Sequence, residues 1–316
     1  MTSYGQILLL VIPVFALMGL GVLARRINWL TEEADASLLK LVVNLLYPCL
    51  ILDHVPANAA LQVPANLAWA PLVGFGTMAL GIGVCYYAGR LLGFTVGTGL
   101  RTFAFTAGIY NYSYVTIPLM TAIFGQDSLG VLFVHNVGAE AAIFTVGVLV
   151  LAGESWSAGW RRLVNAPVVT LVIAVALNLT GLGTHIPGVL LTVIHSLAVC
   201  AIPMGLVLCG ATVAEHLLGR PADLFEARTS LGAVALRLGL LPVVFLVLAK
   251  YGPFPADLRH VVIVQAGMPA AFLPLVLVKY YGGHQLTAVR VVLATVAASI
   301  LLLPWWLQTG LAWAGR

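Results

Sequence analysis

Apolar runs long enough to cross a membrane recur along almost the whole chain. The first, residues 5–24, matches the ~20 residues that a helix needs to span a hydrocarbon core. Others follow at roughly 38–53, 67–92, 99–123 and 128–152 and, after a polar connector at 153–165, at roughly 166–182, 187–214, 229–250, 258–280 and 285–312. Short loops with Pro, Asn, Gly or charged residues separate the runs. The pattern predicts one all-α integral membrane domain over residues 1–316, with about ten transmembrane helices.

Composition supports this class and excludes others. Hydrophobic residues fill 61% of the 316 positions and charged residues 8%, whereas soluble domains have about 25% charged residues. The 15 Lys and Arg are scattered, which argues against nucleic-acid binding. The four cysteines lie inside apolar runs without a CxxC pair, which argues against a metal site or a disulfide. No HExxH, GxSxG or GxGD pattern occurs, so we expect neither an enzyme nor a cofactor.

Positive charge is distributed unevenly between the predicted loops. With ten helices, the odd-numbered loops hold Arg25, Arg26, Arg90, Arg101, Arg161, Arg162, Arg220, Arg228, Lys279 and Arg290. The even-numbered loops and the C-terminus hold only Lys250, Arg259 and Arg316. Because Lys and Arg are retained on the cytoplasmic side, both termini are predicted to lie outside a bacterial inner membrane.

The ten runs divide into two sets of five, at residues 1–152 and 166–316. Three proline pairs have nearly the same spacing, since Pro13 and Pro167, Pro48 and Pro203, and Pro118 and Pro274 are separated by 154, 155 and 156 residues. An odd number of helices in each repeat forces the second copy to be inverted in the membrane, as in many secondary transporters. The sequence thus predicts two inverted five-helix repeats.

The fourth and ninth runs carry polar residues and proline near their centres. In the fourth, residues 110–116 are mostly polar or aromatic and precede Pro118; in the ninth, Gln265 is followed by Pro269 and Pro274. Proline removes a backbone donor, and the groups it frees need partners in lipid. Two ordinary proline kinks are the alternative to a functional break. We predict that both helices are discontinuous and cross at mid-membrane, where transport sites are typically found.

These segments also carry a family resemblance. Residues 111–118, 44–48 (Asn-Leu-Leu-Tyr-Pro), 165–167 (Asn-Ala-Pro) and 268–270 (Met-Pro-Ala) together resemble the auxin efflux carrier family, whose bacterial members include proteins named as malonate or other dicarboxylate transporters. The resemblance implies two inverted five-helix repeats with broken, crossing helices, an architecture similar to sodium/proton antiporters and bile-acid symporters. It also implies a substrate bound at the crossing, and a scaffold beside a moving transport domain. The short connector at 153–165 favours a bacterial carboxylate over auxin.

The broken helices indicate how a substrate is bound. Half-helices that begin near Pro118 and after Pro269 direct unpaired N–H groups at the membrane centre, which suits an anion. The substrate-binding candidates, from the broken helices and the family segments together, are Asn44, Pro48, Tyr110, Asn111, Tyr112, Ser113, Pro118, Gln265, Met268 and Pro269.

Ionisable residues inside membrane spans are expensive and are functional candidates. Glu140 is a proton-coupling candidate or else a structural acceptor, and Arg237 pairs with the substrate or Glu140, or else snorkels toward the interface. His135 and His195 are also proton-coupling candidates. The alternative is structural, since a lone polar residue in a span more often only forms a hydrogen bond. Coupling to a proton or to sodium stays open.

The function expected from these features is secondary transport of a small organic anion, a malonate-like or auxin-like carboxylate, by an elevator or rocking mechanism. The alternatives are a cation/proton antiporter of related architecture and a membrane sensor that moves no solute. The partners expected are the anion and the lipid bilayer, with a homodimer left open.

Overall fold

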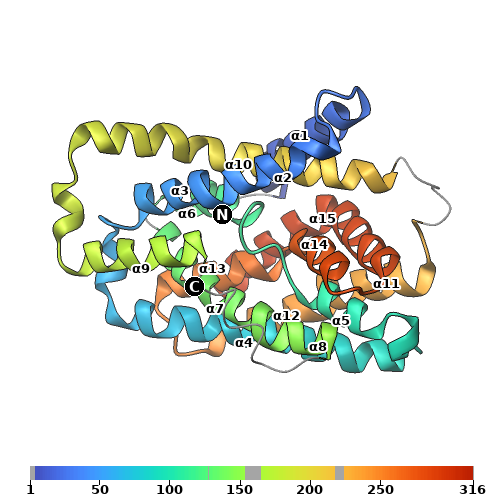
Figure 1. Ribbon diagram of the computed structural model, residues 1–316. Helices are drawn as coiled ribbons and strands as arrows, with labels where there is room; N and C mark the ends of the chain where they lie inside the picture. The colour runs from blue at the N-terminus through green and yellow to red at the C-terminus, as the bar shows by residue number, and fades with distance from the viewer. Residues whose placement is uncertain (1–3, 127, 154–164, 218–223, 316) are drawn as a thin grey trace.

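The computed structural model describes residues 4–126, 128–153, 165–217 and 224–315, and the regular elements among them are helices (Figure 1). Four helices are long and regular throughout: α1 (Tyr4–Arg26), α4 (Pro64–Leu91), α10 (Gly188–Leu217) and α15 (Gln285–Trp313). A shorter helix, α9, covers Ala166–Leu179. The connector residues 154–164, with Arg161 and Arg162, and the loop residue Arg220 lie outside the described residues.

Three further helices each contain one π-helical turn. They are α2 (Glu32–Leu41), η1 (Val42–Leu46) and α3 (Tyr47–His54); α7 (Ser128–Ala142), η4 (Ile143–Gly147) and α8 (Val148–Ala152); and α11 (Ala227–Ala235), η9 (Leu236–Leu240) and α12 (Leu241–Tyr251). Short 3-10 turns lie at η2 (Ala59–Gln62), η3 (Val96–Thr98) and η7 (Leu182–His185). Among the described residues, seven helices are long and apolar enough to span a bilayer.

The fourth and ninth predicted spans are broken, as expected. The fourth consists of α5 (Leu100–Gly108) and α6 (Thr116–Phe124), and the ninth of α13 (Ala256–Ala266) and α14 (Leu273–Tyr280). The two breaks meet in an antiparallel bridge between Tyr110 and Ala270. There, Asn111 N donates to Pro269 O at 2.8 Å, and Ala271 N donates to Ile109 O at 2.9 Å. Each break therefore satisfies backbone groups of the other. The prediction that both helices are discontinuous is confirmed, and the place where the two breaks meet is called the crossing below.

The starts of the two later half-helices differ from the prediction. α6 begins at Thr116, with Pro118 inside its first turn. α14 begins at Leu273, with Pro274 as its second residue, rather than directly after Pro269. The carbonyl of Pro269 is engaged by the bridge, which holds the following residues out of the helix.

The other predicted runs all contain helix, with small differences at the ends. The second begins at Glu32 rather than near residue 38, because Thr31 precedes a first turn with three acidic residues that favour a helix N-terminus. The sixth ends at Leu179 rather than near residue 182, where Gly181 takes a left-handed conformation with φ 73°.

The helices form two groups. The panel group contains α1, α2 to α3, α9 and α10, and the crossing group contains α4 to α8 and α11 to α15; helices pack closely within each group. In Figure 1, α1, α3 and α10 run along the upper side, with α4, α8 and α12 below.

Glycines let helix backbones touch inside both groups. A Cβ atom on Gly210 of α10 would lie 1.9 Å from Met18 O of α1, and one on Gly138 of α7 would lie 1.8 Å from Pro71 O of α4. Such contacts between small residues and a neighbouring backbone are typical of membrane helix pairs. These contacts hold α1 against α10 in the panel group and α4 against α7 in the crossing group.

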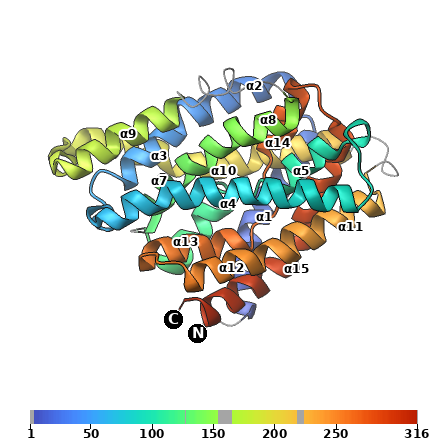
Figure 2. The same cartoon turned by 90° about the horizontal axis from the view of Figure 1, so that it is seen from below.

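The two chain ends lie close together in both views (Figures 1 and 2). This proximity fits the even number of membrane crossings that the sequence predicts. The placement of both ends outside the membrane stays a prediction.

Candidate substrate site

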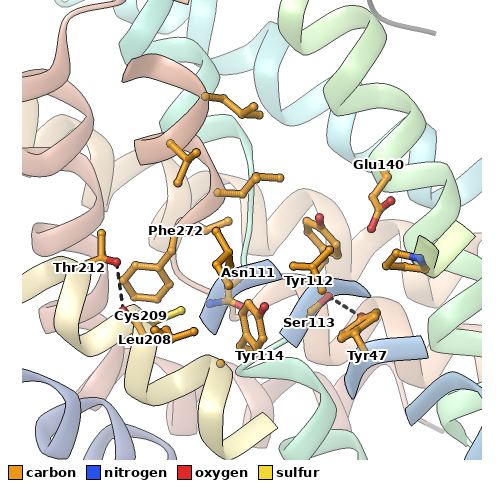
Figure 3. A pocket seen from close by; sticks show the side chains of 18 of the residues that line it. Tyr47, Asn111, Tyr112, Ser113, Tyr114, Glu140, Leu208, Cys209, Thr212 and Phe272 are labelled. Carbon is orange, nitrogen blue, oxygen red and sulfur yellow. Dashed lines mark hydrogen bonds between the residues drawn. The ribbon is translucent and has the colours of Figure 1, made fainter. Parts of the chain in front are cut away.

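A cavity of about 480 Å³ lies beside the crossing, between the panel and crossing groups (Figure 3). Its walls are mostly apolar and include five aromatic side chains: Tyr47, Tyr112, Tyr114, Phe144 and Phe272. The polar side chains that line it are the tyrosine hydroxyls and Asn111, Ser113, Glu140, Asn165 and Thr212. Among the described residues that line it there is no Lys or Arg. Cavities of about 300–1,000 Å³ with apolar walls and a few polar groups are typical small-molecule sites.

Contacts across the cavity join the two groups. Tyr47 of α3 and Ser113 in the first break share a hydrogen bond at 2.9 Å (Figure 3). The ring of Tyr114 packs against Gly205 of α10, where a Cβ atom would lie 2.1 Å from the ring. The cavity wall is therefore divided between the two groups.

The side chain of Asn111 has one polar atom in a structural hydrogen bond and one without a partner among the described residues. It lies inside the break, because α5 already ends at Gly108 and α6 begins at Thr116. Its Oδ1 accepts from Val115 N at 3.3 Å, just before α6 begins. Its Nδ2 is buried and has no hydrogen-bond partner within the part of the chain that the structure describes. A ligand carboxylate in the cavity can supply the missing acceptor.

Both later half-helices begin at the cavity. Phe272 and Leu273 at the start of α14 line it, as do Ser113 and Tyr114 just before α6. Ile117 N and Leu275 N in these first turns donate to Ser113 O and Phe272 O, and each turn contains a proline, so the helix ends contribute mainly positive dipole potential. The cavity therefore offers an anion two helix N-termini and neutral donors.

Glu140 of α7 lines the same cavity. Asn165 Nδ2 donates to its Oε2 at 3.4 Å, and Asn165 Oδ1 accepts from Val168 N at 3.0 Å to cap α9. The carboxyl group of Glu140, which belongs to the crossing group, is thereby held against the first turn of α9 in the panel group.

Seven of the predicted substrate-binding residues do not line the cavity. Tyr110 is fully buried, and its hydroxyl shares a hydrogen bond with Thr77 Oγ1 at 2.9 Å. Gln265 Nε2 lies 3.5 Å from Tyr112 O and so supports the cavity wall from behind. Three more belong to the crossing or its surroundings: Met268, Pro269 and Pro118. The last two, Pro48 and Asn44, come from the second span.

Pro48 is buried directly after the cavity residue Tyr47, without lining the cavity. Asn44 is exposed and donates to Lys40 O at 3.0 Å. Tyr112, Asn111 and Ser113 are thus the predicted substrate-binding residues that the structure brings together at the cavity.

The other proton-coupling candidates lie outside the cavity. His135 is fully buried beside Tyr110, with ring centroids 6.5 Å apart. His195 is exposed, and its Nδ1 lies 3.0 Å from Asp53 Oδ2. Arg237 is fully buried behind the crossing and, within the described residues, forms no salt bridge with Glu140.

Comparison with known proteins gives the family. A family model described as "Membrane transport protein" matches the chain twice, at residues 6–158 and 155–307. The chain belongs to the membrane transport protein family. This is the family of the auxin efflux carriers, so the resemblance is confirmed at that level, as are the internal repeat and the multi-pass transporter class. A protein named "Uncharacterized transporter" from Methanothermobacter thermautotrophicus is 26% identical over 272 residues, which cover 84% of this chain and 86% of that protein.

The transporter's cavity reaches toward one end of the molecule. Leu39, Thr212 and Leu277 line it and lie in the helix halves nearest the odd-numbered, Arg-rich loops. At the other end, Asn178 of α9 holds the segment before α4: its Nδ2 donates to Val55 O at 3.0 Å and to Asn58 O at 2.9 Å. The described conformation is therefore packed at that far end.

Several cavity residues of the transporter were not singled out from the sequence. Tyr47, Tyr114, Phe144, Phe272 and Thr212 line it, yet an aromatic residue in an apolar run has the same appearance whether it faces lipid, core or cavity. Tyr47 and Tyr114 did have a local signal, because they stand inside the family segments at 44–48 and 111–118.

Proposed function

We propose that this transporter carries an organic monocarboxylate with an apolar body, and that the cavity beside the crossing is its binding site. The observation that supports this most strongly is the combination of two helix N-termini with aromatic walls and no lining Lys or Arg among the described residues. An anion held by dipoles and neutral donors is bound without a fixed ion pair. Because no ion pair has to be broken, the anion can be released on the other side of the membrane.

The size and polarity of the cavity favour this substrate class over a short dicarboxylate. A malonate-sized ion fills only a small part of about 480 Å³. Its second carboxylate would lie against aromatic rings or beside Glu140, and an unpaired charge in apolar surroundings is costly. An apolar body, by contrast, gains by contact with Phe144 and Phe272.

We propose that transport follows an elevator mechanism, in which the crossing group moves against the panel group and the two repeats are inverted in the membrane. Support comes from the division of the cavity wall between the two groups and from their tight internal packing. With the odd-numbered loops in the cytoplasm, the described conformation is open inward, and both termini lie outside.

We propose that Glu140 couples transport to a proton. An ionised Glu140 and a bound carboxylate in one cavity repel each other, so binding of the anion favours the protonated carboxyl group and proton binding favours the anion. The protonated group also supplies an O–H donor.

Two experiments test the proposal. Thermal stability of the detergent-purified protein, measured with a panel of aliphatic, aromatic and dicarboxylic acids, identifies ligands, because a ligand that binds only the folded state raises its apparent stability. Flux of the best ligand into proteoliposomes then tests transport. Binding without flux favours a sensor, and cation exchange without anion flux favours the antiporter alternative. A preference for malonate over every monocarboxylate contradicts the proposed substrate class.

A further inference from the structure

A buried cation lies behind the crossing, outside the cavity described above. The side chain of Arg237 is fully buried, and it comes from η9, the π-helical turn between α11 and α12. π-Helical turns are rare and frequently mark functional sites. The turn is stabilised from outside, because Trp306 Nε1 donates to Leu238 O at 2.6 Å.

The guanidinium group of Arg237 has few partners for a buried charge. Its Cζ lies 5.3 Å from the ring centroid of Tyr110 and 5.1 Å from that of Phe245. Its Nη2 lies 3.5 Å from Ala266 O, whereas Nε and Nη1 have no hydrogen-bond partner in the described part of the chain. No salt bridge joins it to a carboxylate of the described residues. An unpaired intramembrane charge is costly, so a compensating negative potential is expected nearby.

The crossing supplies that potential. Ala266 is the last residue of α13, and its carbonyl belongs to the end of a half-helix, where partial negative charge accumulates. Transporters with broken helices hold their coupling cations at such half-helix ends and at unwound carbonyl groups. In this transporter the guanidinium group of Arg237 lies at that position.

The first repeat has no equivalent charge. Gly81 of α4 precedes Arg237 by 156 residues, the same spacing as Pro118 and Pro274. A Cβ atom on Gly81 would lie 2.5 Å from the carbonyl oxygen of Gly108, the last residue of α5. The backbones of α4 and α5 thus touch where the second repeat inserts an arginine. The positive charge at the crossing is a feature of one repeat only.

We propose that Arg237 is a tethered cation that takes the place of a co-transported sodium ion at the crossing, so that the transporter moves its anion without Na⁺. Its charge offsets the C-terminal end of α13 and contributes positive potential next to Tyr110 and Asn111. The inference rests on the proposed anion transport for its role in flux, but the cation requirement of the fold can be measured without any substrate.

The test compares thermal stability of the detergent-purified protein in Na⁺, K⁺ and choline salts at equal ionic strength. The wild-type Tm is expected to be the same in all three. Arg237→Ala is expected to melt lower, and its Tm is expected to rise with added Na⁺ or with guanidinium at concentrations too low to denature, because either ion can enter the emptied position. Arg25→Ala is the matched control: Arg25 is also buried, but it pairs with Asp35 at the end of α1, and its loss should bring no cation dependence.

A specific Na⁺-dependent rise in the wild-type Tm overturns the proposal, and so does an Arg237→Ala protein whose Tm is indifferent to both ions. If Arg237→Ala does not fold, Arg237→Lys keeps the charge and is expected to yield folded protein with no response to Na⁺; a response contradicts the proposal. If neither variant folds, wild-type anion flux decides: equal rates in Na⁺ and choline support the tethered cation, and dependence on Na⁺ refutes it. Failure to find any transported anion would count against the proposed function and leave the result of the cation titration standing.

Discussion

Replacing Asn111 separates a structural role from a substrate role at one side chain. Its Oδ1 accepts from Val115 N, whereas its Nδ2 is buried at the cavity without a partner among the described residues. Asn111→Ala removes both groups. Asn111→Asp keeps an acceptor for Val115 N and replaces the donor by a second oxygen. We therefore expect both variants to bind the substrate more weakly, and we expect them to differ in thermal stability.

The magnitudes follow from the two hydrogen bonds. Loss of the bond to Val115 N is expected to lower the free energy of unfolding by about 1 kcal/mol in Asn111→Ala. Asn111→Asp should lose less, because a carboxylate just before α6 interacts favourably with the helix N-terminus. A hydrogen bond to a charged ligand contributes about 1.5–3 kcal/mol, so both variants should bind a carboxylate about ten- to 150-fold more weakly.

The assay is ligand affinity by calorimetry together with the Tm of the ligand-free protein. Asn66→Ala is the control, because Asn66 is fully buried and donates to Ala60 O and Asp257 Oδ2 without lining the cavity. It should lower the Tm and leave the affinity unchanged. An Asn111→Asp protein that binds its carboxylate within about twofold of wild type would refute the substrate role, since loss of a charged hydrogen bond predicts at least about tenfold.

Three further predictions concern the two helix groups. Gly138→Ala should prevent stable folding or lower the Tm strongly, because the new methyl group meets the Pro71 carbonyl at 1.8 Å, whereas Gly76→Ala, with nothing within 4 Å, should leave the Tm unchanged or raise it. Glu140→Gln should bind the anion but lose the dependence of flux on a pH gradient; flux that still follows the gradient rules out Glu140 as the coupling group. Asn178→Ala should lower the free energy of unfolding by about 1–3 kcal/mol, measurable by thermal melting, since it leaves two buried carbonyl groups without their donor.

The breaks in the fourth and ninth spans could be predicted because their cause is local. Proline close to polar residues in an apolar run disfavours a continuous helix, because the backbone groups that it frees need partners in lipid. The starts of α6 and α14 could not be predicted to the residue, because they depend on the bridge between the two breaks. That bridge joins segments about half the chain apart, and no local pattern encodes its register.

Only the polar residues of the cavity could be predicted from the sequence. Asn111, Ser113 and Glu140 were identified because a polar group in a membrane span needs a reason to be there. Phe272 and Phe144 carry no such mark, since an aromatic ring is equally acceptable facing lipid. Arg237 was identified as expensive, but its position at the end of α13 depends on how the two repeats pack together.

The bridge at the crossing has a consequence for how such a protein could arise. Its two hydrogen bonds, Asn111 N to Pro269 O and Ala271 N to Ile109 O, each join one repeat to the other. A primordial gene encoding a single repeat would have produced a chain whose broken helix exposed backbone groups to lipid, unless a second copy inserted upside down beside it. On the proposed inversion, a chain with a single repeat would need to assemble as a dual-topology homodimer to form the bridge. Only a chain that contains both repeats can carry Gly81 and Arg237 at counterpart positions in one molecule.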